Sequence, residues 1–351
     1  MQYGFSIKRK CYLLSVLLMT VWLTGCVQEE FESTPSPAGN GIRFTLTVPD
    51  VNLPSVSSRT MTGTGTAKKE DEIETVDILV FDMSKTPAVF LEWVSATGVT
   101  QDLADNSTVS FSAVLSPTTA STCIVVVANK ELDNIVSGFT KGATTKVEAM
   151  EKMLHTQTGK WLADGSTTGG YTRIPMYGEK VISKITPSMD PITGINMKRM
   201  LARIDIRNNS VTSNFTVEEV YLANYNTTGY IAPPWNTNGQ ITEPAPDTPV
   251  LPASSGKMTE EGDAILYSVN GNTPYDGEIY TFESLAAKDA GGVGKDGETS
   301  RKDATCLIVK GRIGTGESTF YRVDFTKTGN LGEQVEYLPL KRNHKYIITI
   351  T

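Results

Sequence analysis

The sequence predicts an all-β protein made of two β-sandwich units in series, and three observations support this. Residues 41–48 and 109–115 alternate apolar and polar side chains, which is the pattern of a strand with one buried face. Apolar runs at residues 76–81 and 123–128 are also typical of strands, the first of them a central one. Turn-rich loops separate these short segments, which favours sandwiches over alternating strands and helices.

The chain has 351 residues, a length that fits about two domains. Pro187 and Pro191 mark the expected boundary between them. Ahead of the first domain the sequence has a hydrophobic leader and a polar stretch. We therefore expect a signal peptide, a tether, an N-terminal domain and a C-terminal domain at residues 1–25, 26–40, 41–190 and 191–351.

In the N-terminal domain, further strands are expected at residues 89–94 and 180–185. Apolar residues recur at helical spacing within 145–155, which predicts one short helix. The C-terminal domain opens with apolar patterns at 197–206 and 215–223, and a loop rich in Pro, Asn and Thr follows at 224–262. Its remaining strands are expected at residues 264–269, 278–283, 305–310, 320–325 and 346–351.

The first 26 residues have the features of a cleaved export signal. Lys8, Arg9 and Lys10 precede an apolar run at 11–23 that is too short for a stable membrane anchor. The run ends in Leu-Thr-Gly-Cys, the pattern of a bacterial lipoprotein, in which the thiol of Cys26 carries diacylglycerol and begins the mature chain. One acyl chain binds a bilayer weakly, whereas two or more make a stable anchor. The alternative is a plain secretory signal with a chance cysteine.

The charge of the chain excludes one class of partner. Removing residues 1–25 leaves 29 basic against 39 acidic side chains, a net charge of −10. Such an acidic chain is not expected to bind nucleic acid. Cys123 and Cys306 remain after the signal, both in apolar runs where a cysteine usually serves as a small buried residue, and we expect no disulfide between them.

The sequence offers no catalytic, cofactor or metal site. His155 and His344 are the only histidines, and neither has a cluster of cysteines or carboxylates at ligand spacing. No Gly-x-Ser-x-Gly motif occurs, and two distant histidines give little from which to build a nucleophile with its base. We therefore expect a protein that is not an enzyme. A glycosidase is disfavoured only because no pair of carboxylates stands out.

Two segments are candidates for binding or processing. The first strand is followed by a Ser-, Pro- and Gly-containing stretch with Arg59-Thr60, where a trypsin-like protease would cut an exposed loop, although an ordinary surface arginine fits as well. The second segment is an aromatic loop from Tyr230 to Trp235 that could hold a sugar, or whose Trp could simply pack on the sandwich. The first strand presents one apolar face through Ile42, Phe44, Leu46 and Val48.

Six features follow one another along the chain: Cys26, the Ser-Arg-Thr at 58–60, and residues 76–82, 173–179, 201–206 and 340–346. In this order they resemble the fimbrillin family of type V pilus subunits from Bacteroidales. The resemblance covers nearly the whole mature chain and implies two transthyretin-like, Greek-key β-sandwich domains. It also implies export to the outer membrane as a lipoprotein and, at the cell surface, cleavage after Arg59 by a trypsin-like protease. Loss of the first strand would open a groove for a strand of the next fimbrial subunit.

The sequence departs from this family pattern at its end. It stops at Thr351, directly after the last expected strand, without a C-terminal extension to donate. A chain that accepts a strand but gives none would suit the tip of a fimbrium. A truncated sequence, a last strand that itself swings out, and an uncleaved lipoprotein or anchor are the alternatives. The rival function is a monomeric surface lipoprotein that binds glycan through Tyr230 and Trp235.

Overall fold

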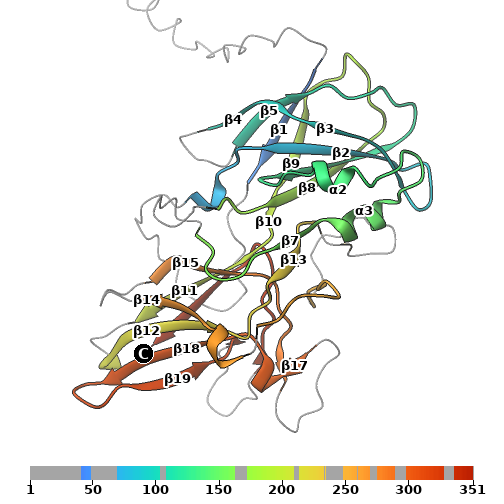
Figure 1. The fold of residues 1–351 in the computed structure, drawn as a ribbon. Helices are drawn as coiled ribbons and strands as arrows, with labels where there is room; N and C mark the ends of the chain where they lie inside the picture. Colours follow the sequence, from blue (N-terminus) through green and yellow to red (C-terminus); the bar gives the residue numbers. More distant parts are fainter. Residues whose placement is uncertain are drawn as a thin grey trace, which may run out of the picture. The chain divides into compact units, whose positions relative to one another are not determined.

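A computed structural model gives the fold of most of the chain after residue 40, and the described residues belong to one compact unit, 41–351. Strands dominate the described part of this unit, which contains two short α-helices (Figure 1). The predicted all-β class, with a short helix in the first half, is confirmed. The structure describes residues 41–48, 69–102, 108–162, 172–208, 213–232, 234, 248–258, 260–268, 275–288, 298–327 and 336–350.

Two sheets form a sandwich in the first half. The four-stranded sheet has the order β4-β5-β1-β9, with β1 at Ile42–Thr47, β4 at Thr97–Gln101, β5 at Thr108–Ala113 and β9 at Ile192–Asn196. The five-stranded sheet has the order β10-β8-β6-β2-β3, with β2 at Val76–Asp82, β3 at Val89–Ser95, β6 at Thr122–Ala128, β8 at Met176–Ile182 and β10 at Lys198–Arg199. Phe44, Ile78 and Val126 lie in the apolar core between them.

The five-stranded sheet is buried on its other face as well. There it packs against two short helices, α2 at Asp133–Val136 and α3 at Lys146–Lys152, in a core that includes Leu79, Val125 and Met150. Burial on both faces explains why residues 78–81 of β2 and 123–128 of β6 are continuous apolar runs rather than alternating ones. Helix α3 begins where the sequence predicts because Thr145 and Glu148 form a capping box.

A second sandwich occupies the other half of the chain. One sheet has the order β15-β11-β22, with β11 at Ala202–Asn208, β15 at Tyr275–Thr281 and β22 at Lys345–Ile350. The other has the order β14-β12-β18-β19, with β12 at Phe215–Ala223, β14 at Ile265–Ser268, β18 at Cys306–Ile313 and β19 at Thr319–Val323. Ile204, Val220, Leu307 and Tyr346 lie in their shared core.

The remaining elements are short. β7 (Leu154–Thr156) pairs with β13 (Thr228–Tyr230), so a ribbon joins the two halves of the sequence. The core beside α2 and α3 also crosses between them, because it contains Leu201 and Tyr280. The other short elements are β16 at Ala287–Lys288, β17 at Thr299–Ser300, β20 at Thr326–Lys327, β21 at Glu336–Tyr337, and the 3-10 helices η1 at Lys69–Asp71, η2 at Glu261–Asp263 and η3 at Arg301–Asp303.

Some boundaries differ from those expected. β8 begins at Met176 rather than at 180, and it contains Gly178, a residue that usually weakens a strand. Glycine is needed there, because a Cβ would lie 2.7 Å from the backbone oxygen of Asn196. The helix expected over 145–155 ends at Lys152, after which Met153 leaves helical dihedral angles and β7 begins. β13 likewise lies inside the segment expected to be a loop.

The sheets of the first sandwich extend beyond residue 190. β9 pairs with β1, and β10 pairs with β8, so residues up to Arg199 complete them. The alternation that would have revealed β9 is broken, because Ile192 and Ile195 are both buried and Gly194 between them has a φ of +73°. The division into two domains stays a prediction, now with the sheet contribution of β9 and β10 added to its first part.

Candidate functional site

The first strand is an inner strand of its sheet. It pairs antiparallel with β5 and parallel with β9, and the oxygen of Thr47 also accepts a hydrogen bond from the amide of Met197 at 2.8 Å. Both backbone edges of β1 are therefore used. Without β1, the facing edges of β5 and β9 would lose their hydrogen-bonding partner.

One face of β1 is buried in the core, together with Val48, which follows the strand. Ile42, Phe44, Leu46 and Val48 are each at most 5% exposed, while Arg43 on the opposite face is exposed. Phe44 stacks on Phe111 of β5, with ring centroids 5.0 Å apart and planes 6° from parallel. Burying four such side chains is worth roughly 6–12 kcal/mol, counted at about 1.5–3 kcal/mol each.

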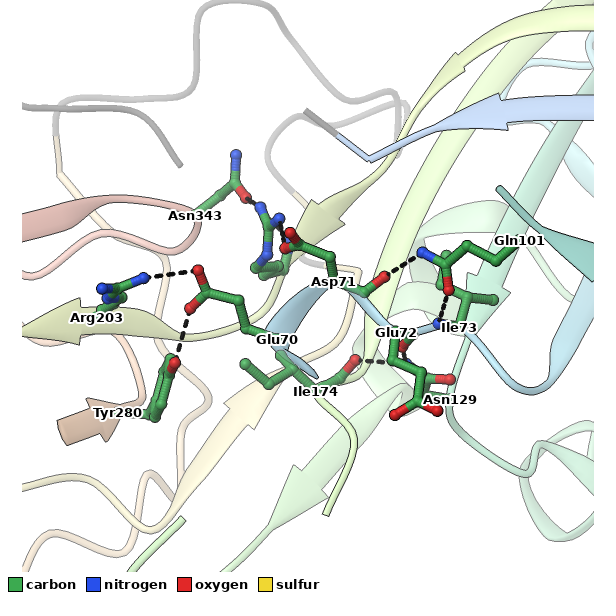
Figure 2. A network of polar contacts seen from close by, with 11 residues as sticks. Glu70, Asp71, Glu72, Ile73, Gln101, Asn129, Ile174, Arg203, Tyr280 and Asn343 are labelled. Atoms are coloured by element: carbon green, nitrogen blue, oxygen red, sulfur yellow. Dashed lines mark hydrogen bonds and ion pairs between the residues drawn. The ribbon is translucent and has the colours of Figure 1, made fainter. Parts of the chain in front are cut away.

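The described chain resumes at η1, and polar contacts hold this short helix against the second sandwich (Figure 2). Glu70 accepts a hydrogen bond from Nη1 of Arg203 and another from the hydroxyl of Tyr280, each at 2.7 Å. On the side of the first sandwich, Asp71 forms an ion pair with Arg199 of β10. Burial, together with the charge of Glu70, raises the pKa of Tyr280 far above its ordinary value, so this hydroxyl stays a donor.

The backbone beside η1 is held by side chains of the first sandwich (Figure 2). Gln101 donates to the oxygen of Asp71 at 2.8 Å and accepts from the amide of Ile73 at 3.0 Å. Asn129 donates to the oxygen of Glu72 at 2.7 Å. The segment around η1 therefore has its own contacts with both halves of the sequence, independent of β1.

The sequence of the chain matches the model of a known protein family. The sequence model of the family described as "Major fimbrial subunit protein (FimA)" matches residues 42–300, well over half of the chain. The chain belongs to this family. Membership confirms the resemblance found in the sequence and implies a structural subunit that assembles with other fimbrial subunits at the cell surface.

The solved structures similar to this fimbrial subunit include two of low sequence identity. The tip fimbrial protein Mfa3 from Porphyromonas gingivalis, with a C-terminal truncation, is 16% identical with a TM-score of 0.48, over 88% of this chain and 94% of that one. A candidate cell adhesion protein from Parabacteroides distasonis is 17% identical with a TM-score of 0.46, over 89% and 88%. No curated protein matches the chain.

Four of the sequence-predicted site residues of this fimbrial subunit, Cys26, Arg59, Thr60 and Trp235, lie outside the described residues. Tyr230 is described and ends β13, where its backbone oxygen accepts a hydrogen bond from Nη2 of Arg342 at 2.7 Å. The family match does not favour the alternative of a monomeric glycan-binding lipoprotein.

A buried ion pair between Arg342 and Glu283 of this fimbrial subunit was not predicted from its sequence. Arg342 and Glu283 have side chains that are 2% and 7% exposed, and Nη2 of Arg342 lies 2.7 Å from Oε2 of Glu283. Nη1 of Arg342 also donates to the oxygen of Ile231 at 2.8 Å. Arg342 belongs to the motif at 340–346 that carried the family resemblance, but only the fold brings it to Glu283.

Among the described residues of this fimbrial subunit, no three His, Cys, Asp or Glu side chains come together as metal ligands. No helix in the same part of the chain is long and apolar enough to cross a membrane. Cys123 and Cys306 are buried free thiols, and burial raises the pKa of Cys123 to about 12 and that of Cys306 to about 11. Neither thiol is suited to act as a nucleophile at neutral pH.

The stability of this fimbrial subunit should depend on pH through His155, whose ring lies 5.2 Å from that of Trp161. Burial, with the nearby charge of Lys130, lowers the pKa of His155 from 6.5 to about 4. Between these values the unfolded chain binds a proton that the folded protein does not. We therefore expect the free energy of unfolding to fall as the pH drops from 6.5 towards 4.

Urea unfolding of the full chain at several pH values between 7 and 4 measures this effect. His155→Asn should show a weaker fall than the parent chain over the same interval. His344, whose pKa burial also lowers, is present in both proteins, so its contribution cancels in the difference. Parallel curves for the two proteins would contradict this assignment.

Proposed function

We propose that this fimbrial subunit is exported as a lipoprotein through Cys26 and assembles by strand exchange after cleavage at Arg59-Thr60. The observation that supports the proposal best is the position of β1. It is an inner strand with one face fully buried, and the expected cut lies between it and η1 in the sequence. η1 is held by its own contacts. A cut between β1 and η1 therefore separates β1, which can then leave, from η1, which stays bound.

Loss of β1 would create a site that only another strand can fill well. The groove would have an apolar floor and two open backbone edges, those of β5 and β9. A donated strand in the orientation of β1 would run antiparallel to β5 and parallel to β9, and it would need the same alternation of apolar residues. The burial energy available, roughly 6–12 kcal/mol for four such side chains, must exceed the cost of association.

In this proposal the lipid holds the uncut chain at the outer membrane, and a trypsin-like protease releases it into the fimbrium. Cleavage then couples release from the membrane to opening of the groove. A place at the fimbrial tip, rather than in the shaft, stays a prediction.

The test is the N-terminus and intact mass of the protein recovered from the cell surface, together with its assembly state. We expect a start at Thr60 in assembled material, and an uncut, unassembled chain in Arg59→Gln. Arg43→Gln is the matched control, because Arg43 lies within paired β1 and its loss should leave processing unchanged. Acylated Cys26 on all of the surface protein, or assembly by Arg59→Gln, would overturn the proposal.

A further inference from the structure

The last described strand, β22, is an edge strand. It forms one edge of the sheet β15-β11-β22 and pairs with β11 in parallel. The turn before it places Asn343 at a φ of +55°, a backbone conformation that asparagine tolerates better than most residues. What fixes this turn and the start of β22 therefore decides how firmly the strand is held.

One series of charged contacts runs from η1 to β22. Glu70 pairs with Arg203 of β11, and Nε of Arg203 lies 2.9 Å from Oδ1 of Asp205. Oδ2 of Asp205 lies 3.0 Å from Nζ of Lys345, the first residue of β22. The Asp205 side chain is fully buried. Burial works to lower the pKa of Arg203, but Glu70 and Asp205 raise it overall, so the guanidinium stays charged.

A second series starts one residue later and ends at the turn before β22. Asp71 pairs with Arg199, and Nη1 of Arg199 donates to Oδ1 of Asn343 at 2.8 Å (Figure 2). The Arg199 side chain is 3% exposed. The two neighbouring carboxylates of η1 thus each reach the C-terminal segment through one arginine.

We propose that Glu70 and Asp71 form a clamp that holds the start of β22, so that moving η1 loosens the last strand. Removing one partner of a buried charged group weakens the contacts around that group. Displacing η1 takes away one carboxylate from Arg203 and one from Arg199. Arg203 contacts Asp205, which pairs with Lys345 at the start of β22. Arg199 contacts Asn343 in the turn before β22. By thermodynamic linkage, loosening β22 also loosens η1.

The clamp is a property of the uncut chain and does not depend on processing at Arg59. If the chain is cut there, Glu70 and Asp71 stay on the retained side, and the clamp gives the new N-terminal segment a direct connection to the last strand. A test in the uncut chain therefore separates the clamp from the proposed strand exchange.

Hydrogen–deuterium exchange of the full uncut chain is the test. In Glu70→Gln/Asp71→Asn, the amides of β22 should exchange about tenfold faster or more, while those of β12 and β18 keep their protection. Glu72→Gln is the matched control, because this neighbouring carboxylate pairs with Arg173, 3.2 Å away, at the start of the segment that leads into β8. Its β22 should exchange as in the parent chain.

The reciprocal variant gives a second readout and covers the case in which the double variant does not fold. In Lys345→Gln, the amide of Ile73, which donates to Gln101, should exchange faster than in the parent chain. If all sheets of the double variant lose protection together, the Lys345→Gln result decides. The clamp is overturned if β22 exchanges equally in the parent and double variant, or if Lys345→Gln leaves Ile73 unchanged.

Discussion

Replacing Phe44 with alanine is expected to lower the free energy of unfolding of the uncut chain by about 3–5 kcal/mol. The Phe44 side chain is 1% exposed and stacks on Phe111. The core around it comes from both sheets of the first sandwich, so the cavity left by the missing ring cannot collapse easily. Chemical denaturation of the full chain, followed by tryptophan fluorescence or circular dichroism, measures the loss.

Arg43→Ala is the control for this prediction. Arg43 is the next residue of the same strand, but it is exposed, so its replacement should change stability by less than about 0.5 kcal/mol. The pair also tests the fate of β1. In protein that has lost β1 by cleavage, Phe44→Ala and the parent chain should be equally stable, and a difference would mean that β1 is retained.

Arg342→Ala is expected to cost about 3–5 kcal/mol, because it leaves Glu283 buried without its charged partner. The same change removes hydrogen bonds to the backbone oxygens of Tyr230 and Ile231, which are 2.7 and 2.8 Å from the guanidinium. The loss should appear as a lower denaturation midpoint, with the slope of the transition unchanged.

A surface pair of the same residue types provides the control. Arg312 and Glu218 lie 3.1 Å apart with side chains 47% and 25% exposed, so Arg312→Ala should cost no more than about 1 kcal/mol. Adding Glu283→Gln to Arg342→Ala should recover part of the stability, because the uncompensated charge is then gone. Equal losses for Arg342→Ala and Arg312→Ala would show that burial of the ion pair carries no weight.

The sequence could predict elements whose pattern is local. The alternation of β1 and the apolar runs of β2 and β6 marked these strands correctly, and the spacing of Met150 with its neighbours marked helix α3. These signals depend on one face or both faces of a single element being buried, so they can be read within one short window.

The polar contacts could not be predicted in this way. Glu70 and Arg203 are 133 positions apart, and Arg199 and Asn343 are 144 apart, so no local pattern connects them. β9 was also missed, because Gly194 interrupts its alternation. The candidate site was therefore foreseen as a strand, but its partner β9 and the anchoring of η1 required the fold.

The pairing of β1 with β9 has a consequence for how the protein is made. Phe44 aligns with Phe111 of β5, 67 positions along the chain, but with Ile192 of β9, 148 positions along, so the edge of β1 that faces β9 is among the last to find its partner. Contacts of such high contact order form slowly, since a long stretch of chain must be ordered first. A newly made subunit thus passes through an interval in which one edge of β1 is still open, and an open strand edge can pair with another chain.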